Sequence, residues 1–277
     1  MSTERLQALL TQPDEELDLA EAALCVAQDE YPGLNVGEYL NRLDELAERL
    51  KHKLPEGAGF EARVVALNEF LFDELGFSGN TDDYYDPRNS FLNEVIDRRV
   101  GIPITLSILY MEIGRRVGLE LEGVSFPGHF LVKSATDEGD VVLDPFAGGV
   151  PVAEEDLVQR LEMRFGEDQA RLAPLPQLLV AANKKDILVR MLRNLKAIYL
   201  HREAWDKALT TMNRILMIAP NLPEEVRDRA ELYERLECFR PALDGYRHYM
   251  ELSPASPEVL DVRRKIIDLE RLASRLN

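Results

Sequence analysis

Hydrophobic positions recur every three or four residues along most of the first hundred residues, which is the period of an amphipathic helix. Segments of this kind, each bounded by proline or glycine, cover residues 14–32, 35–54 and 61–77. Residues 78–90 are rich in turn formers and predict a loop. At the end of this loop, Asn89 or Ser90 can cap a short helix, which Gly101 terminates.

The pattern changes after residue 101. Residues 103–117 are apolar around nearly the whole helix circumference, which predicts a central helix buried on most sides and ended by Gly118. Three short β-rich runs that predict strands of an antiparallel sheet follow at 121–126, 129–133 and 141–145. A further helix is expected over residues 153–165, and residues 173–177 predict a linker.

The last hundred residues repeat with a period of 34. The residues in phase are Tyr199 and Tyr233, Ala208 and Ala242, and Pro220 and Pro254. This period and these residue types are typical of tetratricopeptide helix pairs, and a helix that starts at Ser256 would cap the array. Two positions depart from the pattern, because Lys196 replaces a glycine and Arg229 replaces an apolar residue.

Composition and charge restrict the function classes. The chain is 45% hydrophobic and 30% charged, which is typical of a folded protein. No apolar run approaches the roughly 18 residues that span a bilayer, and no secretory signal is evident, so we expect a cytoplasmic protein without membrane contact. The net charge of −17 lies mostly in the first two thirds and would repel phosphate backbones, so we expect no nucleic-acid partner.

Histidine and cysteine residues give few candidates for chemistry. His52, His201 and His248 are expected to be solvated or to lie between helices. No two histidines have the spacing of metal ligands, so we expect neither a metal nor another cofactor. Cys25 and Cys238 lie in different helical segments and are expected to be buried small apolar residues.

His129 and Asp144 form the strongest candidate pair. If the strands that carry them pair through the turn at residues 137–140, both side chains lie at the same end of the sheet. An imidazole beside a carboxylate is the general-base half of a nucleophilic site. In the alternative interpretation, His129 bonds the backbone of its turn, and Asp144 caps the loop at residues 145–149.

Three motifs, DPRNSFLNEVIDRRVGIPITLS, PGHFLVK and LDPFAGG, resemble the bacterial Sir-B family, which joins a transglutaminase-like domain to C-terminal tetratricopeptide repeats. The resemblance implies a papain-like core: a central helix against a small antiparallel sheet, with a nucleophilic cysteine opening the helix and a histidine and an aspartate on adjacent strands. His129 and Asp144 match the last two, but Pro103 stands where the cysteine is expected. We therefore predict a mostly helical α+β protein with domains at 1–170 and 178–277.

Other residues near this cleft are weaker candidates. Thr105 offers a hydroxyl, but residues two apart on a helix point roughly 200° apart, and the helix backbone can accept its hydrogen bond. Asn89 and Asn93 share a helix face and either line the cleft, beside Pro103, or brace helix ends. Tyr85 belongs to an aromatic and acidic loop that suits contact with a partner.

The favoured function is therefore non-enzymatic protein–protein interaction or regulation, with a protein partner held by the repeat groove or by the cleft. The alternative is a hydrolase or amidase in which His129 and Asp144 activate water or Thr105.

Overall fold

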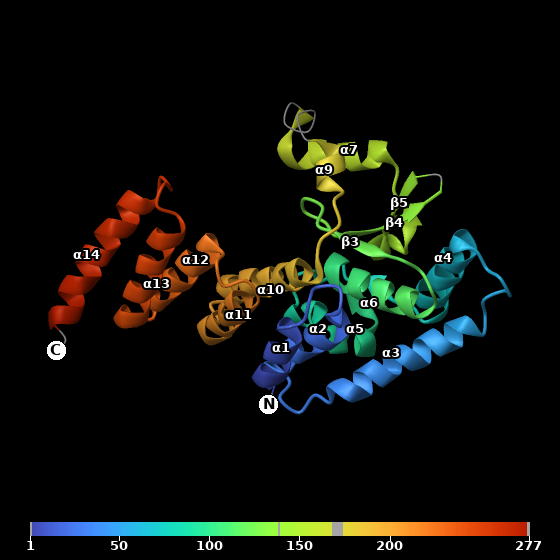
Figure 1. Cartoon of the computed structure of the whole chain (residues 1–277), viewed down its shortest axis with the longest axis horizontal. Helices are drawn as coiled ribbons and strands as arrows, with labels where there is room; N and C mark the ends of the chain where they lie inside the picture. The colour runs from blue at the N-terminus through green and yellow to red at the C-terminus, as the bar shows by residue number, and fades with distance from the viewer. Residues whose placement is uncertain (1, 138, 168–173, 276–277) are drawn as a thin grey trace. The chain divides into compact units, whose positions relative to one another are not determined.

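The computed structural model describes residues 2–137, 139–167 and 174–275, and Figure 1 shows their helices and strands. The chain forms two compact units, Met1–Met191 and Leu192–Asn277. The first unit combines helices with small sheets, and the described part of the second is helical. The predicted class, mostly helical α+β, is therefore confirmed. Within the described ranges, no helix is both long enough and apolar enough to cross a membrane.

The first unit begins with helices that pack around a common centre. They are α1 (Ser2–Leu10), α2 (Leu19–Ala27), α3 (Val36–Lys51), α4 (Phe60–Asn68), a π-helical turn (Glu69–Glu74), a 3-10 turn (Pro87–Ser90) and α5 (Leu92–Arg98). The side chains of Asp18 and Asn35 accept hydrogen bonds from Glu21 N at 2.8 Å and Glu38 N at 3.3 Å. These caps satisfy N–H groups that a helix leaves free at its start, so α2 and α3 begin at these residues.

Helix α6 (Pro103–Arg116) is the centre of the first unit. Every residue from Pro103 to Gly114 is buried, and α2, α3, α4 and α5 all contact this helix. Pro103 is its first residue, where a missing N–H leaves no hydrogen bond unmade. The prediction of a buried central helix is confirmed.

An antiparallel sheet follows α6, with strands in the order β3 (Glu122–Val124), β4 (Leu131–Thr136), β5 (Gly139–Asp144) and β6 (Val150–Pro151). A separate parallel pair joins β1 (Ser78–Gly79) to β2 (Val100–Gly101). The four strands are neighbours in sequence order, so each strand of the larger sheet pairs with the next one along the chain. In the register, Leu131 of β4 lies opposite Val124 of β3, and Val132 lies opposite Leu143 of β5.

The predicted strand at residues 129–133 needs a correction, because β4 begins only at Leu131. Pro127 and Gly128 form a turn in which Gly128 has a φ of 74°, and His129 N donates to Phe126 O at 3.0 Å. Proline followed by a residue of positive φ is typical of a tight β-turn. His129 therefore lies in the turn that precedes β4 rather than in the strand.

Helices cover both faces of the four-stranded sheet (Figure 1). Helix α6 contacts β3 and β4 from one side. On the other side, helices α7 (Glu154–Phe165) and α9 (Leu175–Leu178) pack on the sheet through a cluster formed by Val124, Phe126, Leu131, Val142, Leu157, Leu161 and Leu175. The linker predicted at 173–177 is thus partly helix α9, and its residue 173 lies outside the described residues.

Gly149 joins the end of the sheet to helix α4. Its φ is 75°, its carbonyl accepts from Asn68 Nδ2 at 2.9 Å, and a Cβ atom would lie 2.1 Å from Asn68 Oδ1. We expect Gly149→Ala to lower the free energy of unfolding by about 3 kcal/mol, from backbone strain and a displaced hydrogen bond. Urea denaturation followed by circular dichroism measures this loss.

The control is the neighbouring Gly148, which has a similar φ of 83°, although a Cβ atom added there would meet no atom within 4 Å. We expect Gly148→Ala to lower the free energy of unfolding by only about 1 kcal/mol, because the substitution strains the backbone but causes no steric clash. Equal losses for the two variants would show that the Asn68 contact does not matter.

The second unit is built from paired helices. Helix α10 (Lys184–His201) runs into it, and the helices that follow are α11 (Trp205–Ile218), α12 (Pro223–Arg235), α13 (Phe239–Leu252) and α14 (Val259–Arg275). Ala208 and Ala242, which repeat at 34 residues, are both completely buried. A Cβ atom on Gly245 would lie 2.8 Å from Ala230 Cβ, so α12 and α13 cross closely. The small residues therefore have the packing role that the repeat pattern predicts.

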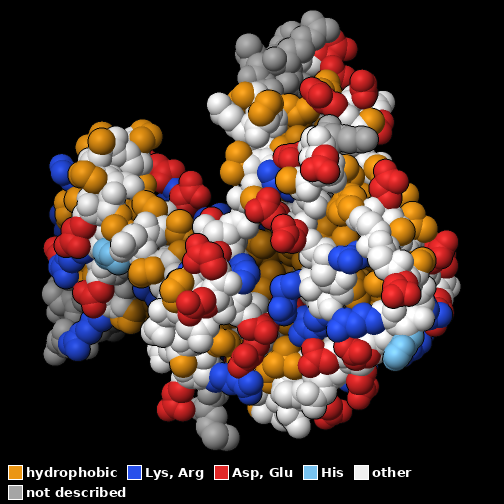
Figure 2. Space-filling model, turned by 45° about the vertical axis from the view of Figure 1, so that its right-hand side comes forward, with side chains coloured by type: hydrophobic (Ala, Val, Ile, Leu, Met, Phe, Trp, Pro, Cys, Tyr) orange, Lys and Arg blue, Asp and Glu red, His pale blue; other side chains and the backbone are white. Residues whose placement is uncertain are grey.

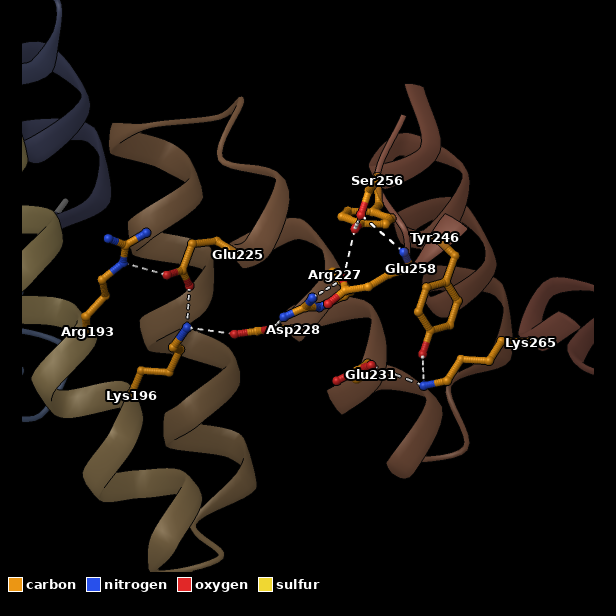
Figure 3. A network of polar contacts seen from close by, with 11 residues as sticks. Arg193, Lys196, Glu225, Arg227, Asp228, Glu231, Tyr246, Ser256, Glu258 and Lys265 are labelled. Atoms are coloured by element: carbon orange, nitrogen blue, oxygen red, sulfur yellow. Dashed lines mark hydrogen bonds and ion pairs between the residues drawn. The ribbon is translucent and has the colours of Figure 1, made fainter. Parts of the chain in front are cut away.

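The two departures from the repeat pattern are occupied by polar contacts within this unit. Lys196 Nζ on α10 donates to Glu225 Oε2 at 2.7 Å and to Asp228 Oδ2 at 2.9 Å on α12 (Figure 3). Arg229 on α12 donates to Asn213 Oδ1 on α11 at 2.9 Å. Each of these long side chains forms hydrogen bonds to another helix of the unit.

The two cysteines differ in exposure. Cys25 lies in α2 and is 1% exposed, as expected for a small apolar residue. Cys238 is exposed at the start of α13, so the expectation that it is buried is wrong. The repeat pattern places Cys238 just before the helix, where a side chain need not enter the core.

Acidic and basic side chains are interspersed over the face drawn in Figure 2, with hydrophobic side chains between them. Arg116, for example, contacts Asp44 at 2.7 Å and Glu112 at 2.6 Å. Acidic residues outnumber basic ones, 50 to 33, so a basic side chain readily meets a carboxylate. A basic side chain without a carboxylate partner is therefore a candidate for binding an acidic group of another molecule.

Candidate functional site

His129 and Asp144 meet at one end of the four-stranded sheet. Asp144 is the last residue of β5, and His129 precedes β4, the strand that pairs with β5. His129 Nε2 lies 2.9 Å from Asp144 Oδ1. The carboxylate side chain is 2% exposed and the imidazole 18% exposed. The structure thus brings together the two residues that the sequence singles out, with the imidazole on the solvent side.

Asp144 makes two further contacts. Its Oδ1 accepts from Phe146 N at 3.1 Å, and its Oδ2 accepts from Arg160 Nη2 of α7 at 2.9 Å. Burial alone would raise the pKa of this carboxyl, but hydrogen bonds and charge interactions with His129 and Arg160 hold the pKa below its ordinary value. An ionised carboxylate can only accept, so His129 Nε2 carries the proton in this pair.

The lowered pKa predicts how stability depends on pH. Because the folded pKa of Asp144 lies below that of the unfolded chain, its contribution is complete above about pH 4, the ordinary value for aspartate, and is lost as pH falls through the folded pKa. We expect the unfolding free-energy difference between the wild type and Asp144→Asn to narrow as pH falls below about 4. Urea denaturation at each pH measures this difference, and a gap that widens in acid would contradict it.

Arg190 holds the backbone of the turn that carries His129. Arg190 Nη2 in α10 donates to Phe126 O at 3.0 Å and to His129 O at 2.7 Å. The His129 ring also meets Phe146 edge to face, with centroids 5.9 Å apart. These contacts fix both the backbone and the ring of His129 in unit 1.

His129 opens onto a shallow pocket of about 350 Å³. Its lining is Pro127, Gly128, His129, Arg160, Met163 and Arg164. These residues come from the turn before β4 and from α7, and the lining includes no residue of α6, a helix that the structure describes completely. The register explains this, because Asp144 lies on the same face as Leu131, which packs against α7.

Comparison with known proteins assigns both parts of the chain. Residues 37–193 match the transglutaminase-like superfamily, and residues 195–266 match a tetratricopeptide repeat family. The chain belongs to the transglutaminase-like superfamily. Residues 37–193 are called the transglutaminase-like domain from here on.

Two bacterial relatives match nearly the whole chain, and a human relative matches about half of it. A UPF0162 protein of Xylella fastidiosa (strain Temecula1) is 42% identical over 94% of this chain and 93% of its own length. A UPF0162 protein of Vibrio cholerae is 33% identical over 87% of this chain and 88% of its own length. Human F-box only protein 21 is 32% identical over 51% of this chain and 26% of its own length. No solved structure matches the chain.

The remaining predicted site residues of the transglutaminase-like domain lie mostly in its interior. Thr105 is completely buried, and its hydroxyl donates to Asn89 O at 2.7 Å. Asn93 is 3% exposed and Pro103 is buried. Tyr85 alone among the residues proposed to line the cleft is on the surface, at 70% exposed.

Asn89 holds the loop that precedes α5. It is completely buried, its Oδ1 accepts from Asn80 Nδ2 at 3.0 Å, and its Nδ2 donates to Asp83 O at 2.8 Å. Asn89 therefore orders the backbone of this loop and does not face solvent.

Three residues beside the pair, Arg160, Arg164 and Arg190, were not predicted from the sequence as site residues. Arg160 and Arg164 are four residues apart on one helix, so their spacing indicates a shared face. Nothing in the spacing indicates that this face meets Asp144. Among the described residues, no three His, Cys, Asp or Glu side chains gather in a way that could hold a metal ion.

Proposed function

We propose that this chain is a non-enzymatic protein-interaction protein, in which the transglutaminase-like domain binds without forming a covalent intermediate and the repeats hold a protein segment. The observation that carries this proposal is the pocket beside His129. A nucleophilic enzyme needs its nucleophile within hydrogen-bond reach of the base. The residues that line this pocket offer no hydroxyl or thiol, because the helix from which a nucleophile is expected is not part of the lining.

A proline also occupies the position at which the resemblance to the Sir-B family places the nucleophilic cysteine. Pro103 begins α6, and it has neither a proton to transfer nor a lone pair to attack with. Cys25 is buried within α2, and the hydroxyl of Thr105 is committed to Asn89 O. Neither Cys25 nor Thr105 is therefore presented to His129 as a free nucleophile, which supports a binding role.

The repeat unit supplies a charged face for a partner. Ion pairs join α10, α12 and α14 in succession: Arg193 and Lys196 contact Glu225, Arg227 contacts Asp228 and Glu258, and Lys265 contacts Glu231 (Figure 3). We call this face the ion-pair face. Its outer members are partly exposed, with Arg193 at 42% and Glu231 at 48%. Tetratricopeptide arrays bind segments along such extended surfaces.

A photo-crosslinking experiment tests the repeat proposal in cells that express the full chain. A benzoylphenylalanine placed at Glu231, on the ion-pair face, is compared with one at Arg240, an exposed position on α13. We expect a discrete crosslinked protein from position 231 and none from position 240. Crosslinks of equal yield from both positions, or from position 240 alone, would contradict binding along the ion-pair face.

A second candidate function is water-based hydrolysis, and one observation favours it. The His129–Asp144 hydrogen bond of 2.9 Å orients an imidazole that is partly open to solvent, and a general base of this kind typically contributes 10²–10⁴-fold. The regulatory role that the Sir-B resemblance implies is compatible with binding and needs no turnover. The two functions are separated by an activity measurement on His129→Ala.

A further inference from the structure

The pocket beside His129 is positively charged in an otherwise acidic protein. Of its lining residues, Arg160 and Arg164 are cationic, whereas none is acidic. Arg160 is paired with Asp144. Asp144 also accepts from His129, so one carboxylate serves both groups. The carboxylate of Asp144 therefore does not neutralise all the positive charge that lines the pocket.

Arg164 is the source of the excess charge. It is exposed and forms no ion pair or hydrogen bond with any residue that the structure describes. Its guanidinium lies over the ring of Phe165, 5.6 Å from the centroid. It also lies against Gly128, since a Cβ there would be 2.6 Å from Arg164 Nη1. A guanidinium placed in this way presents a fork of N–H donors that matches a carboxylate.

An apolar side chain lines the charged pocket, and aromatic side chains lie on α7 and beside His129. Met163 is 74% exposed and Phe165 is 45% exposed. Phe146, which contacts the His129 ring, also contacts the ring of Tyr84, with centroids 6.3 Å apart, and Tyr84 contacts Tyr85. Arginine, tyrosine, phenylalanine and methionine are the residues enriched in protein-binding surfaces. The surroundings suit a peptide better than a free anion.

We propose that the pocket formed by the Pro127–His129 turn and α7 binds a carboxylate of a peptide that also carries an apolar side chain. Arg164 provides the cation, and the exposed Met163 and Phe165 contact the apolar group. A polyanion such as a nucleic acid is disfavoured, because the net charge of −17 repels it beyond this small pocket. The inference rests on the proposal that the transglutaminase-like domain binds rather than cleaves, and it is separate from binding on the ion-pair face.

The test uses three fluorescent pentapeptides and the full chain. The first, Gly-Leu-Glu-Phe-Gly-amide with an uncharged fluorophore on its N-terminal nitrogen, carries one side-chain carboxylate. The second has glutamine in place of glutamate and carries none, and the third is the glutamine peptide with a free C-terminal carboxylate. We expect the first or the third to bind at least about tenfold more tightly than the second in fluorescence anisotropy, and which of the two binds identifies the source of the carboxylate.

Protein variants locate the binding. We expect Arg164→Gln to weaken binding of the carboxylate peptide about tenfold, and Arg240→Gln, which removes the same charge from an exposed site on α13, to leave it unchanged. Circular dichroism shows that each variant is folded. Equal affinity for all three peptides, no binding of any of them, or an unchanged affinity in folded Arg164→Gln would each overturn the proposal.

Mass spectrometry of the peptides after incubation separates this inference from the function on which it rests. Peptides that bind and are recovered intact support both. Peptides that bind through Arg164 and are cleaved would refute the non-enzymatic function while leaving the carboxylate site in place.

Discussion

Replacing Asp144 by alanine is expected to lower the unfolding free energy of the first unit by about 3–5 kcal/mol, the typical cost of removing one partner from a buried ion pair. The carboxylate is 2% exposed and accepts hydrogen bonds from His129, Phe146 and Arg160. Its loss leaves the Arg160 guanidinium and the Phe146 N–H without their acceptors. Hydrogen exchange of the β4 and β5 amides measures this loss of unfolding free energy in the two strands that carry the pair.

Asp140 on the same strand provides the matched control. Its side chain is 55% exposed and lies 3.4 Å from Lys133 Nζ, so Asp140→Ala should cost less than about 1 kcal/mol, as for other surface ion pairs. A loss from Asp144→Ala no larger than that from Asp140→Ala would show that the buried pair does not hold this end of the sheet.

Replacing Glu225 by alanine is expected to lower the unfolding free energy of the repeat unit by about 3–5 kcal/mol. Glu225 lies in the first turn of α12, its side chain is 2% exposed, and it accepts from Arg193 Nε and Lys196 Nζ, both at 2.7 Å. Alanine would leave Lys196, itself only 12% exposed, with Asp228 as its remaining carboxylate. The stability of the whole ion-pair face depends on this residue.

The single tryptophan makes this measurement specific. Trp205 lies in α11 of the repeat unit, with the Arg235 guanidinium 3.9 Å from its ring centroid, so its fluorescence in urea reports unfolding of this unit. Glu224, the exposed neighbour in the same helical turn, is the control, and Glu224→Ala should change stability by less than about 0.5 kcal/mol. Similar midpoints for the two variants would show that the buried carboxylate is dispensable.

Periodicity was enough to predict the framework of the fold. The apolar circumference of residues 103–117 indicates burial without knowledge of what covers the helix, and the structure buries Pro103–Gly114. The 34-residue spacing of Ala208 and Ala242 likewise indicates where helices cross. Both patterns are regular spacings between residues that are close in sequence, so they can be recognised from the sequence alone.

The environment of the candidate site could not be predicted in the same way. The strand pairing brings His129 and Asp144 together, as their spacing indicates, but the contact from Arg160 depends on how α7 folds back over the sheet. Which face Asp144 occupies depends on the register at Leu131, and a shift of one residue reverses the face. The direction in which the pocket opens is therefore a property of the tertiary structure.

The most direct test of a binding rather than a catalytic site is the rate of amide hydrolysis by the full chain. The wild type and His129→Ala are compared on a panel of peptide amides and esters, with circular dichroism to show that both proteins are folded. We expect both proteins to give the same rate as buffer alone. Turnover by the wild type that His129→Ala abolishes would contradict it and would identify the His129–Asp144 pair as a catalytic base.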